Sequence, residues 1–185
     1  MKRCILLALV LTALILAACG GDVKVLGTEN SDGQQNGAGT SFSPEGAVDG
    51  YLFQTSGLTI AADAAMQPIL EALGEPKQYY EAASCAFNGL DKMYTYDHFE
   101  VDSYPAPDGD RVMAVYLLDD LVATPEGLRV GDSTEKAKQL YGAAQETVGT
   151  EWIYEKGGMK LKVLFENGAV ASITYASQTL GKAAV

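Results

Sequence analysis

Few residues of this 185-residue chain have the types and spacing that catalysis requires. His98 is the single histidine, and the sequence contains no Gly-x-Ser-x-Gly motif and no Cys-x-x-Cys pair. We expect His98 in a turn between two strands, without the buried orienting group of a Ser-His-Asp or Cys-His site. Cys85 has no base or positive charge beside it in the sequence, so we expect a buried, unreactive thiol. These residues favour a protein that is not an enzyme.

The carboxylates are densest at Asp108-Gly-Asp110 and at Asp119-Asp120. Hard cations such as Ca²⁺ bind several carboxylate oxygens, but the spacing of an EF-hand loop is absent and Asp-Gly is common in turns. A glycosidase also uses paired carboxylates, but it sets them in a deep cleft that a small domain does not obviously offer. We therefore expect no metal site and no cofactor.

Aromatic side chains are the candidates for binding. Tyr94 and Tyr96 share one face of an expected strand, and Trp152 and Tyr154 share one face of another. Tyrosine and tryptophan are favoured at recognition surfaces, so these four residues are the candidate binding residues. The alternative is that they pack in the core, as aromatic residues of strands usually do.

Two similar stretches of sequence must position these side chains. In residues 51–123 the sequence predicts a hairpin with a Ser56-Gly57 turn, and then a helix that ends at Gly74. Pro68 lies near the beginning of this helix. Three strands are predicted to follow it, over residues 93–96, 99–104 and 111–117.

Residues 124–176 repeat this plan in shorter form. Asp132 and Glu135 have the spacing of a capping box, at the start of a helix that ends at Gly142. Asn167-Gly168 is a strong hairpin signal within three predicted strands, over residues 151–155, 159–166 and 169–175. We therefore expect an α+β fold, a tandem helix-plus-antiparallel-strand repeat with the helices packed on one face of the sheet.

The charge of the chain excludes one class of partner. There are 24 acidic and 13 basic side chains, which give a net charge of −11. Nucleic acid requires a positively charged face, so we expect no nucleic-acid partner.

The first residues have the layout of a secretory signal. Lys2 and Arg3 precede an apolar run over residues 5–16, which is shorter than the ~20 residues that span a bilayer. The run ends in Leu16-Ala-Ala-Cys19, which resembles the lipobox of bacterial lipoproteins in all four positions. This resemblance implies cleavage before Cys19, a covalent lipid on its sulfur, and membrane lipid as a partner of the anchor. The alternative is a plain signal peptide cut at a small-residue site.

The chain is therefore expected to have three parts. Residues 1–18 are the cleaved signal peptide, and residues 19–50 are the lipidated cysteine and a glycine-rich tether that is too polar to fold alone. Residues 51–185 form the folded domain, with its two repeats over about 51–123 and 124–176.

The folded part also resembles known proteins. It contains Cys85-Ala-Phe-Asn-Gly-Leu-Asp-Lys-Met-Tyr-Thr-Tyr96, Tyr104-Pro105, Asp119-Asp120 and Thr124-Pro-Glu-Gly127, which resemble uncharacterised lipoproteins of Gram-positive, mainly clostridial, bacteria. Its repeat is similar to the β-lactamase-inhibitor-protein-like class and to the small outer-membrane assembly lipoproteins, which are binding modules.

Together with the lipobox, these resemblances imply a non-catalytic binding module that is lipid-anchored at the extracytoplasmic face of the cell membrane. Its expected partner is an envelope protein or a cell-wall component. The alternative is a carboxylate-based envelope hydrolase or a cation-binding protein.

Overall fold

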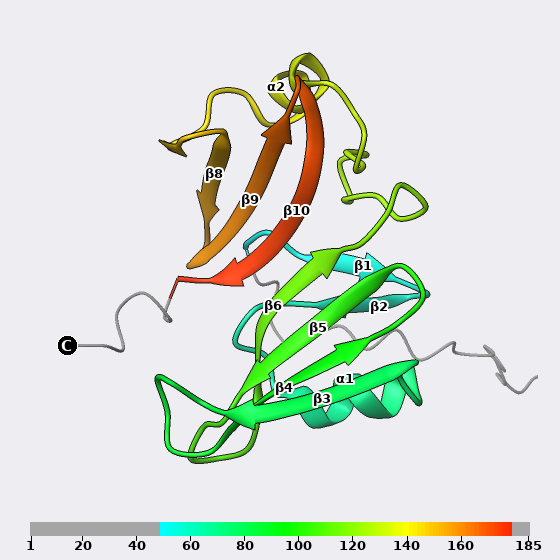
Figure 1. Cartoon of the computed structure of the whole chain (residues 1–185), viewed down its shortest axis with the longest axis vertical. Coiled ribbons are helices and arrows are strands. Elements are labelled where there is room, and N and C mark those ends of the chain that lie inside the picture. The colour runs from blue at the N-terminus through cyan, green and yellow to red at the C-terminus, as the bar shows by residue number, and fades with distance from the viewer. Residues whose placement is uncertain (1–48, 179–185) are drawn as a thin grey trace, which may run out of the picture. The chain divides into compact units, whose positions relative to one another are not determined.

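The computed structural model describes residues 49–178, which all belong to one structural unit. Two of the described strands form a small sheet, and eight form one antiparallel sheet in the order β3-β4-β5-β6-β10-β9-β8-β7 (Figure 1). In chain order the elements are β1 (Phe53–Thr55), β2 (Leu58–Ile60), α1 (Met66–Leu73), β3 (Gln78–Ala83), β4 (Leu90–Thr95), β5 (Phe99–Tyr104), β6 (Arg111–Leu117), α2 (Thr134–Tyr141), β7 (Glu146–Val148), β8 (Glu151–Lys156), β9 (Met159–Glu166) and β10 (Ala169–Ser177).

The expected α+β class is wrong, because the described residues are mostly β. α1 and α2 have eight residues each, whereas the large sheet has eight strands. The sequence reasoning overlooked β3 and β7, which lie at the two edges of that sheet. Every residue of these two strands is exposed, so neither shows the alternation of buried and exposed positions by which strands are found. Two four-stranded meanders, β3 to β6 and β7 to β10, stand in place of the expected helix-plus-strand repeat.

The two meanders join through a single strand pair. β6 pairs with β10 antiparallel, which places Val115 opposite Tyr175 and Leu117 opposite Ile173. All four side chains are buried. The sheet is therefore continuous, and its two halves share one hydrophobic core.

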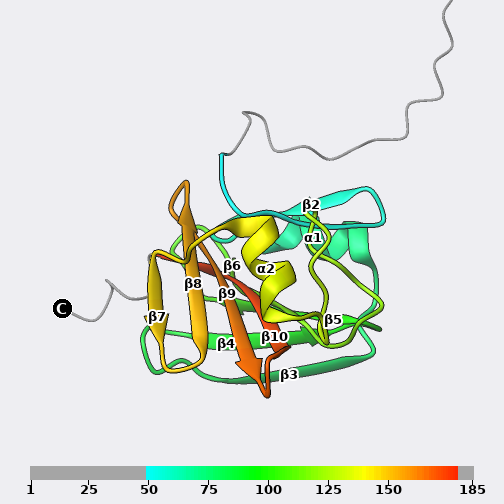
Figure 2. The same ribbon diagram turned by 90° about the horizontal axis from the view of Figure 1, so that it is seen from above.

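This core lies against one face of the sheet. It includes Met66 and Ile69 of α1, Ala137 of α2 and Phe53 of β1, packed with apolar residues of the central strands. In Figure 2, α1 and the β1–β2 hairpin lie on the same side of β4 and β5. Both helices of the described residues contribute to this core, and neither packs on the opposite face of the sheet.

The predicted turns and the end of the first helix are confirmed. Ser56 and Gly57 have φ values of 46° and 80°, and Asn167 and Gly168 have values of 52° and 81°. Two successive positive φ values are what a type I′ hairpin turn requires. α1 ends at Leu73, and Gly74 follows with a positive φ.

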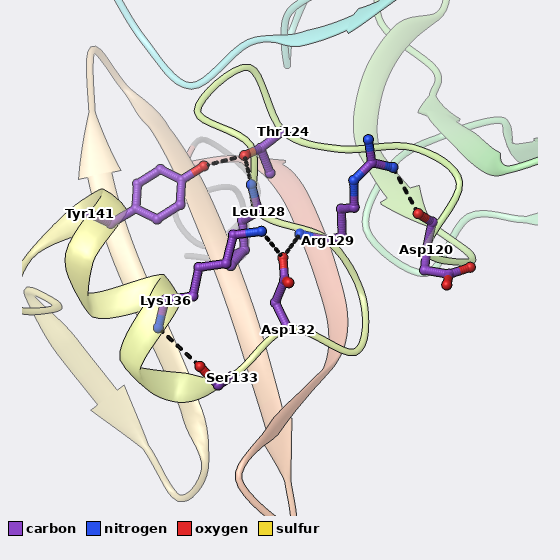
Figure 3. Close-up of polar contacts among 8 residues, drawn as sticks. All are labelled: Asp120, Thr124, Leu128, Arg129, Asp132, Ser133, Lys136 and Tyr141. Atoms are coloured by element: carbon purple, nitrogen blue, oxygen red, sulfur yellow. Dashed lines mark hydrogen bonds and ion pairs between the residues drawn. The ribbon is translucent and has the colours of Figure 1, made fainter.

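The predicted cap of α2 is wrong by one residue. Ser133, and not Asp132, is the N-cap, and its Oγ accepts a hydrogen bond of 3.2 Å from the Lys136 amide (Figure 3). Asp132 instead uses Oδ2 to accept from the Arg129 amide and from Lys136 Nζ, both at 2.7 Å. Asp132 therefore ties the loop before α2 to the helix.

The described residues contain no helix long and apolar enough to cross a membrane. The predicted signal peptide over residues 1–18 and Cys19 lie outside the described residues. The predicted tether over residues 19–50 also lies outside them, apart from its last two residues.

Candidate functional site

The sheet has a second face, which points away from the core. Successive side chains of a strand point to opposite faces, and paired residues of neighbouring strands point to the same face. Tyr94 and Val101 are paired and buried in the core, so Met93 and Asp102, the next pair, lie on the opposite face. We call this surface of β3 to β6 the outer face, and its side chains are Gln78, Tyr80, Ala82, Asp91, Met93, Thr95, Glu100, Asp102, Ala114 and Tyr116.

Asp102 is the buried carboxylate of the outer face. It is 8% exposed and is paired with Met93 of β4 and with Ala114 of β6. Its Oδ1 is buried and has no hydrogen-bond partner. Buried charged groups in proteins are normally paired or hydrogen-bonded. The described part of the chain thus leaves this acceptor without a donor.

Two more carboxylates lie close to Asp102. Asp91 of β4 also has a buried Oδ1 without a partner, and Glu100 of β5 accepts a hydrogen bond of 2.6 Å from Thr95 Oγ1. Burial raises the pKa of Asp102 to about 7, and the charges of Glu100 and Asp91 add to the effect. Among the described residues, no lysine or arginine forms an ion pair with any of these three carboxylates.

Apolar side chains surround the carboxylates. Tyr80 of β3 is 62% exposed, and Met93, which is paired with it, is 36% exposed. Tyr116 of β6 is half-buried, and burial raises the pKa of its hydroxyl, with Asp102 and Glu100 as further causes. The outer face therefore combines accessible apolar surface with acceptors that have no donor.

The same face of the second meander is organised differently. Lys160 forms an ion pair with Glu155 at 3.2 Å, and Lys162 forms one with Glu151 at 3.7 Å. Two of the acidic side chains there, Glu155 and Glu151, thus have lysine partners on the neighbouring strand. Among the described residues, buried carboxylate oxygens without a partner occur on β4 and β5 and not in the second meander.

Compared with protein families, with curated proteins and with solved structures, the chain matches none. The resemblance to lipoproteins of Gram-positive bacteria stays a prediction from the residues quoted for it.

The four predicted binding residues lie on the core side of the sheet. Tyr94 and Tyr154 are buried in the core, while Tyr96 and Trp152 are partly buried and pack against it. Tyr96 lines a shallow hollow of about 350 Å³ at the end of α1, and Trp152 lines one of about 290 Å³ beyond α2. These aromatic residues do not lie on the outer face.

The other candidates from the sequence have structural partners. His98 lies in the turn between β4 and β5, with Nδ1 2.8 Å from Asp119 Oδ2, a pairing that the sequence did not reveal. Asp108 forms an ion pair with Arg111, and Asp110 forms one with Lys92 at 2.6 Å.

The thiol of Cys85 and the carboxylates differ in how they lie in the structure. Cys85 is exposed, so the expectation of a buried thiol is wrong. No three His, Cys, Asp or Glu side chains of the described residues lie close enough together to hold a metal ion. His98 also lines the 350 Å³ hollow together with Ser56, but no hydrogen bond of the described residues joins the two side chains.

The sequence reasoning missed Asp102. The run Phe99-Glu-Val-Asp-Ser-Tyr104 alternates apolar and acidic residues, which is the usual pattern of a strand with one solvated face. The available signal was the absence of any lysine or arginine among the residues paired with the acidic positions of β5.

Proposed function

We propose that this protein is a non-catalytic binding module, held at the extracytoplasmic face of a cell membrane by a lipid on Cys19. Its partner is an envelope protein that docks on the outer face of β3 to β6. The observation that carries the proposal is Asp102, a buried carboxylate whose Oδ1 has no donor in the described chain. A docking partner supplies what such a group lacks.

The apolar surroundings of Asp102 support docking at this place. Tyr80 and Met93 present accessible aromatic and thioether surface beside it, and side chains of these types are enriched at protein interfaces. The three carboxylates add charge that discriminates between partners.

The anchor explains how the face reaches a partner. A lipidated Cys19 fixes the chain to the membrane, and two or more acyl chains are needed for stable anchoring. The tether that the sequence predicts over residues 19–50 would have an r.m.s. reach of about 30 Å as a coil, which would hold the domain clear of the lipid headgroups.

Photocrosslinking in intact cells tests the proposal. A benzoylphenylalanine replaces Tyr80 on the outer face, or Leu121 in the loop after β6, which is equally exposed at 66%. We expect a specific protein adduct from position 80 and none from position 121. Equal adducts from both positions, or none from position 80, would contradict docking on the outer face.

A further inference from the structure

The outer face holds two carboxylates on neighbouring strands, Asp91 of β4 and Asp102 of β5. Met93 of β4 is paired with Asp102 of β5, and Asp91 lies two residues before Met93 on the same face. Residues in this diagonal relation lie about 7–8 Å apart. Asp91 and Asp102 each have a buried Oδ1 without a partner, so the described chain leaves two nearby acceptors without a donor. Both atoms are covered in the unbound protein, so a donor of a partner reaches them only when side chains beside them, such as the partly exposed Met93, move aside.

The surroundings of this pair fit a long, charged side chain. Arginine and lysine bury their methylene stems against apolar surface and keep the charged head on polar groups. Met93 is paired with Asp102 and lies two residues from Asp91 on β4. Tyr80 of β3 is paired with Met93. Apolar surface that can hold the methylene groups of a long side chain thus adjoins oxygen atoms that can accept hydrogen bonds from its charged end.

We propose that the outer face binds a cationic side chain, an arginine or a lysine, of its partner protein between Asp91 and Asp102. This inference rests on the proposed binding function and names the chemistry of the partner. An arginine fits better than a lysine, because its planar guanidinium carries five donors and can serve two carboxylates at once.

A metal ion fits this place less well. Ca²⁺ requires six to eight oxygen ligands, and the described residues contain no group of three acidic, histidine or cysteine side chains that could hold a metal ion. In the second meander, lysines pair with Glu151 and Glu155, so a cationic side chain can serve carboxylates on this face of the sheet.

Binding of the cation is linked to the release of a proton. At neutral pH part of the Asp102 population is protonated, because its pKa is about 7. A bound cation favours the ionised carboxylate, so affinity falls as the pH is lowered below 7. Three other titratable groups face Asp102, namely Asp91 of β4, Glu100 of β5 and Tyr116 of β6.

The test uses the full mature chain, from residue 19 onward with its lipid, in a neutral detergent. A fluorescent tetra-arginine peptide is the probe, in 100 mM salt, and binding is followed by anisotropy. We expect Asp102→Asn to weaken binding at least tenfold, because the amide oxygen that replaces the carboxylate carries no negative charge for the cation. Asp91→Asn should act in the same direction.

The matched control is Glu166→Gln, which removes an exposed carboxylate at the end of β9, in the other meander. It should change the affinity less than twofold. The affinity of the unmodified chain should rise from pH 5.5 to pH 8, and the rise should be smaller in Asp102→Asn. Circular dichroism shows that each variant is folded.

Three results would overturn the inference: no binding of the peptide at millimolar concentration, equal binding by Asp102→Asn, or displacement of the peptide by millimolar Ca²⁺. The crosslinking experiment separates this inference from the proposed function. If position 80 gives its adduct while Asp102→Asn binds the peptide normally, docking on the outer face is supported and the cationic contact at Asp102 is refuted.

Discussion

Replacing Asp102 by asparagine should change the stability of the fold in a manner that depends on pH. Burial raises the pKa of this carboxyl from 3.8 to about 7 in the folded protein. Between these two values the folded chain binds more protons than the unfolded chain, so the free energy of unfolding decreases as the pH rises. Stability from the protonated carboxyl is fully present below about pH 4 and is lost by about pH 7.

The size of the effect follows from the pKa change. At about 1.4 kcal/mol per pH unit, the change from 3.8 to about 7 corresponds to about 4 kcal/mol. The free energy of unfolding of Asp102→Asn, relative to the unmodified chain, should therefore increase by about 4 kcal/mol between pH 4 and pH 8. The asparagine amide has unpaired groups of its own, but this contribution is the same at every pH and cancels in the comparison.

Urea denaturation at pH 4, 5, 6, 7 and 8 measures this difference. The chain begins at residue 19 and carries Cys19→Ser, so that no lipid interferes with the measurement. Glu166→Gln serves as the control, and its difference from the unmodified chain should stay constant over this range. A constant difference for Asp102→Asn as well would show that Asp102 is not a buried carboxyl in the folded protein, and the argument for the outer face would fail.

Four further variants concern the anchor, the core and α2. Cys19→Ala should release the protein into the medium or leave its precursor uncut; unchanged partitioning into detergent would refute lipidation. Tyr175→Phe should leave thermal stability unchanged or slightly raised, because the Tyr175 hydroxyl is buried without a partner. Tyr141→Phe removes the 2.6 Å hydrogen bonds that the Tyr141 hydroxyl makes with Thr124 and Glu126, so it should destabilise the folded protein by about 1–3 kcal/mol. Equal melting temperatures for Tyr175→Phe and Tyr141→Phe would contradict this contrast. Ser133→Ala should destabilise by about 1 kcal/mol in urea titrations through loss of the α2 cap, and no change would show that Ser133 does not cap the helix.

The sequence predicted those elements whose side chains alternate or whose turns need special residues. Arg111–Leu117 and Met159–Glu166 largely alternate in burial, and the structure has strands over these residues. The Asn167-Gly168 hairpin follows from the positive φ values that these residues tolerate. Local rules of this kind depend on a few neighbouring residues, so one sequence is sufficient for them.

The remainder depends on contacts between distant parts of the chain. β3 has no buried residue and exists because its backbone pairs with β4, so its sequence carries no pattern. The burial of Asp102 has the same origin, because it is set by neighbours on β4 and β6 that are not close to it in sequence. The fold class was mispredicted for this reason, since two additional edge strands changed the balance of helix and sheet.

The seam between β6 and β10 has a consequence for the order of folding. Hairpins such as β5–β6 and β9–β10 are local, and local contacts of this kind form early. The pair of Val115 with Tyr175 closes a loop of sixty residues, and contacts so distant in sequence form slowly. β10 is the last strand of the described chain, so the backbone edge of β6 stays unpaired until β10 has been made. A chain that lacks β10 therefore has two separate meanders and an incomplete core, because Ile173 and Tyr175 are missing from it.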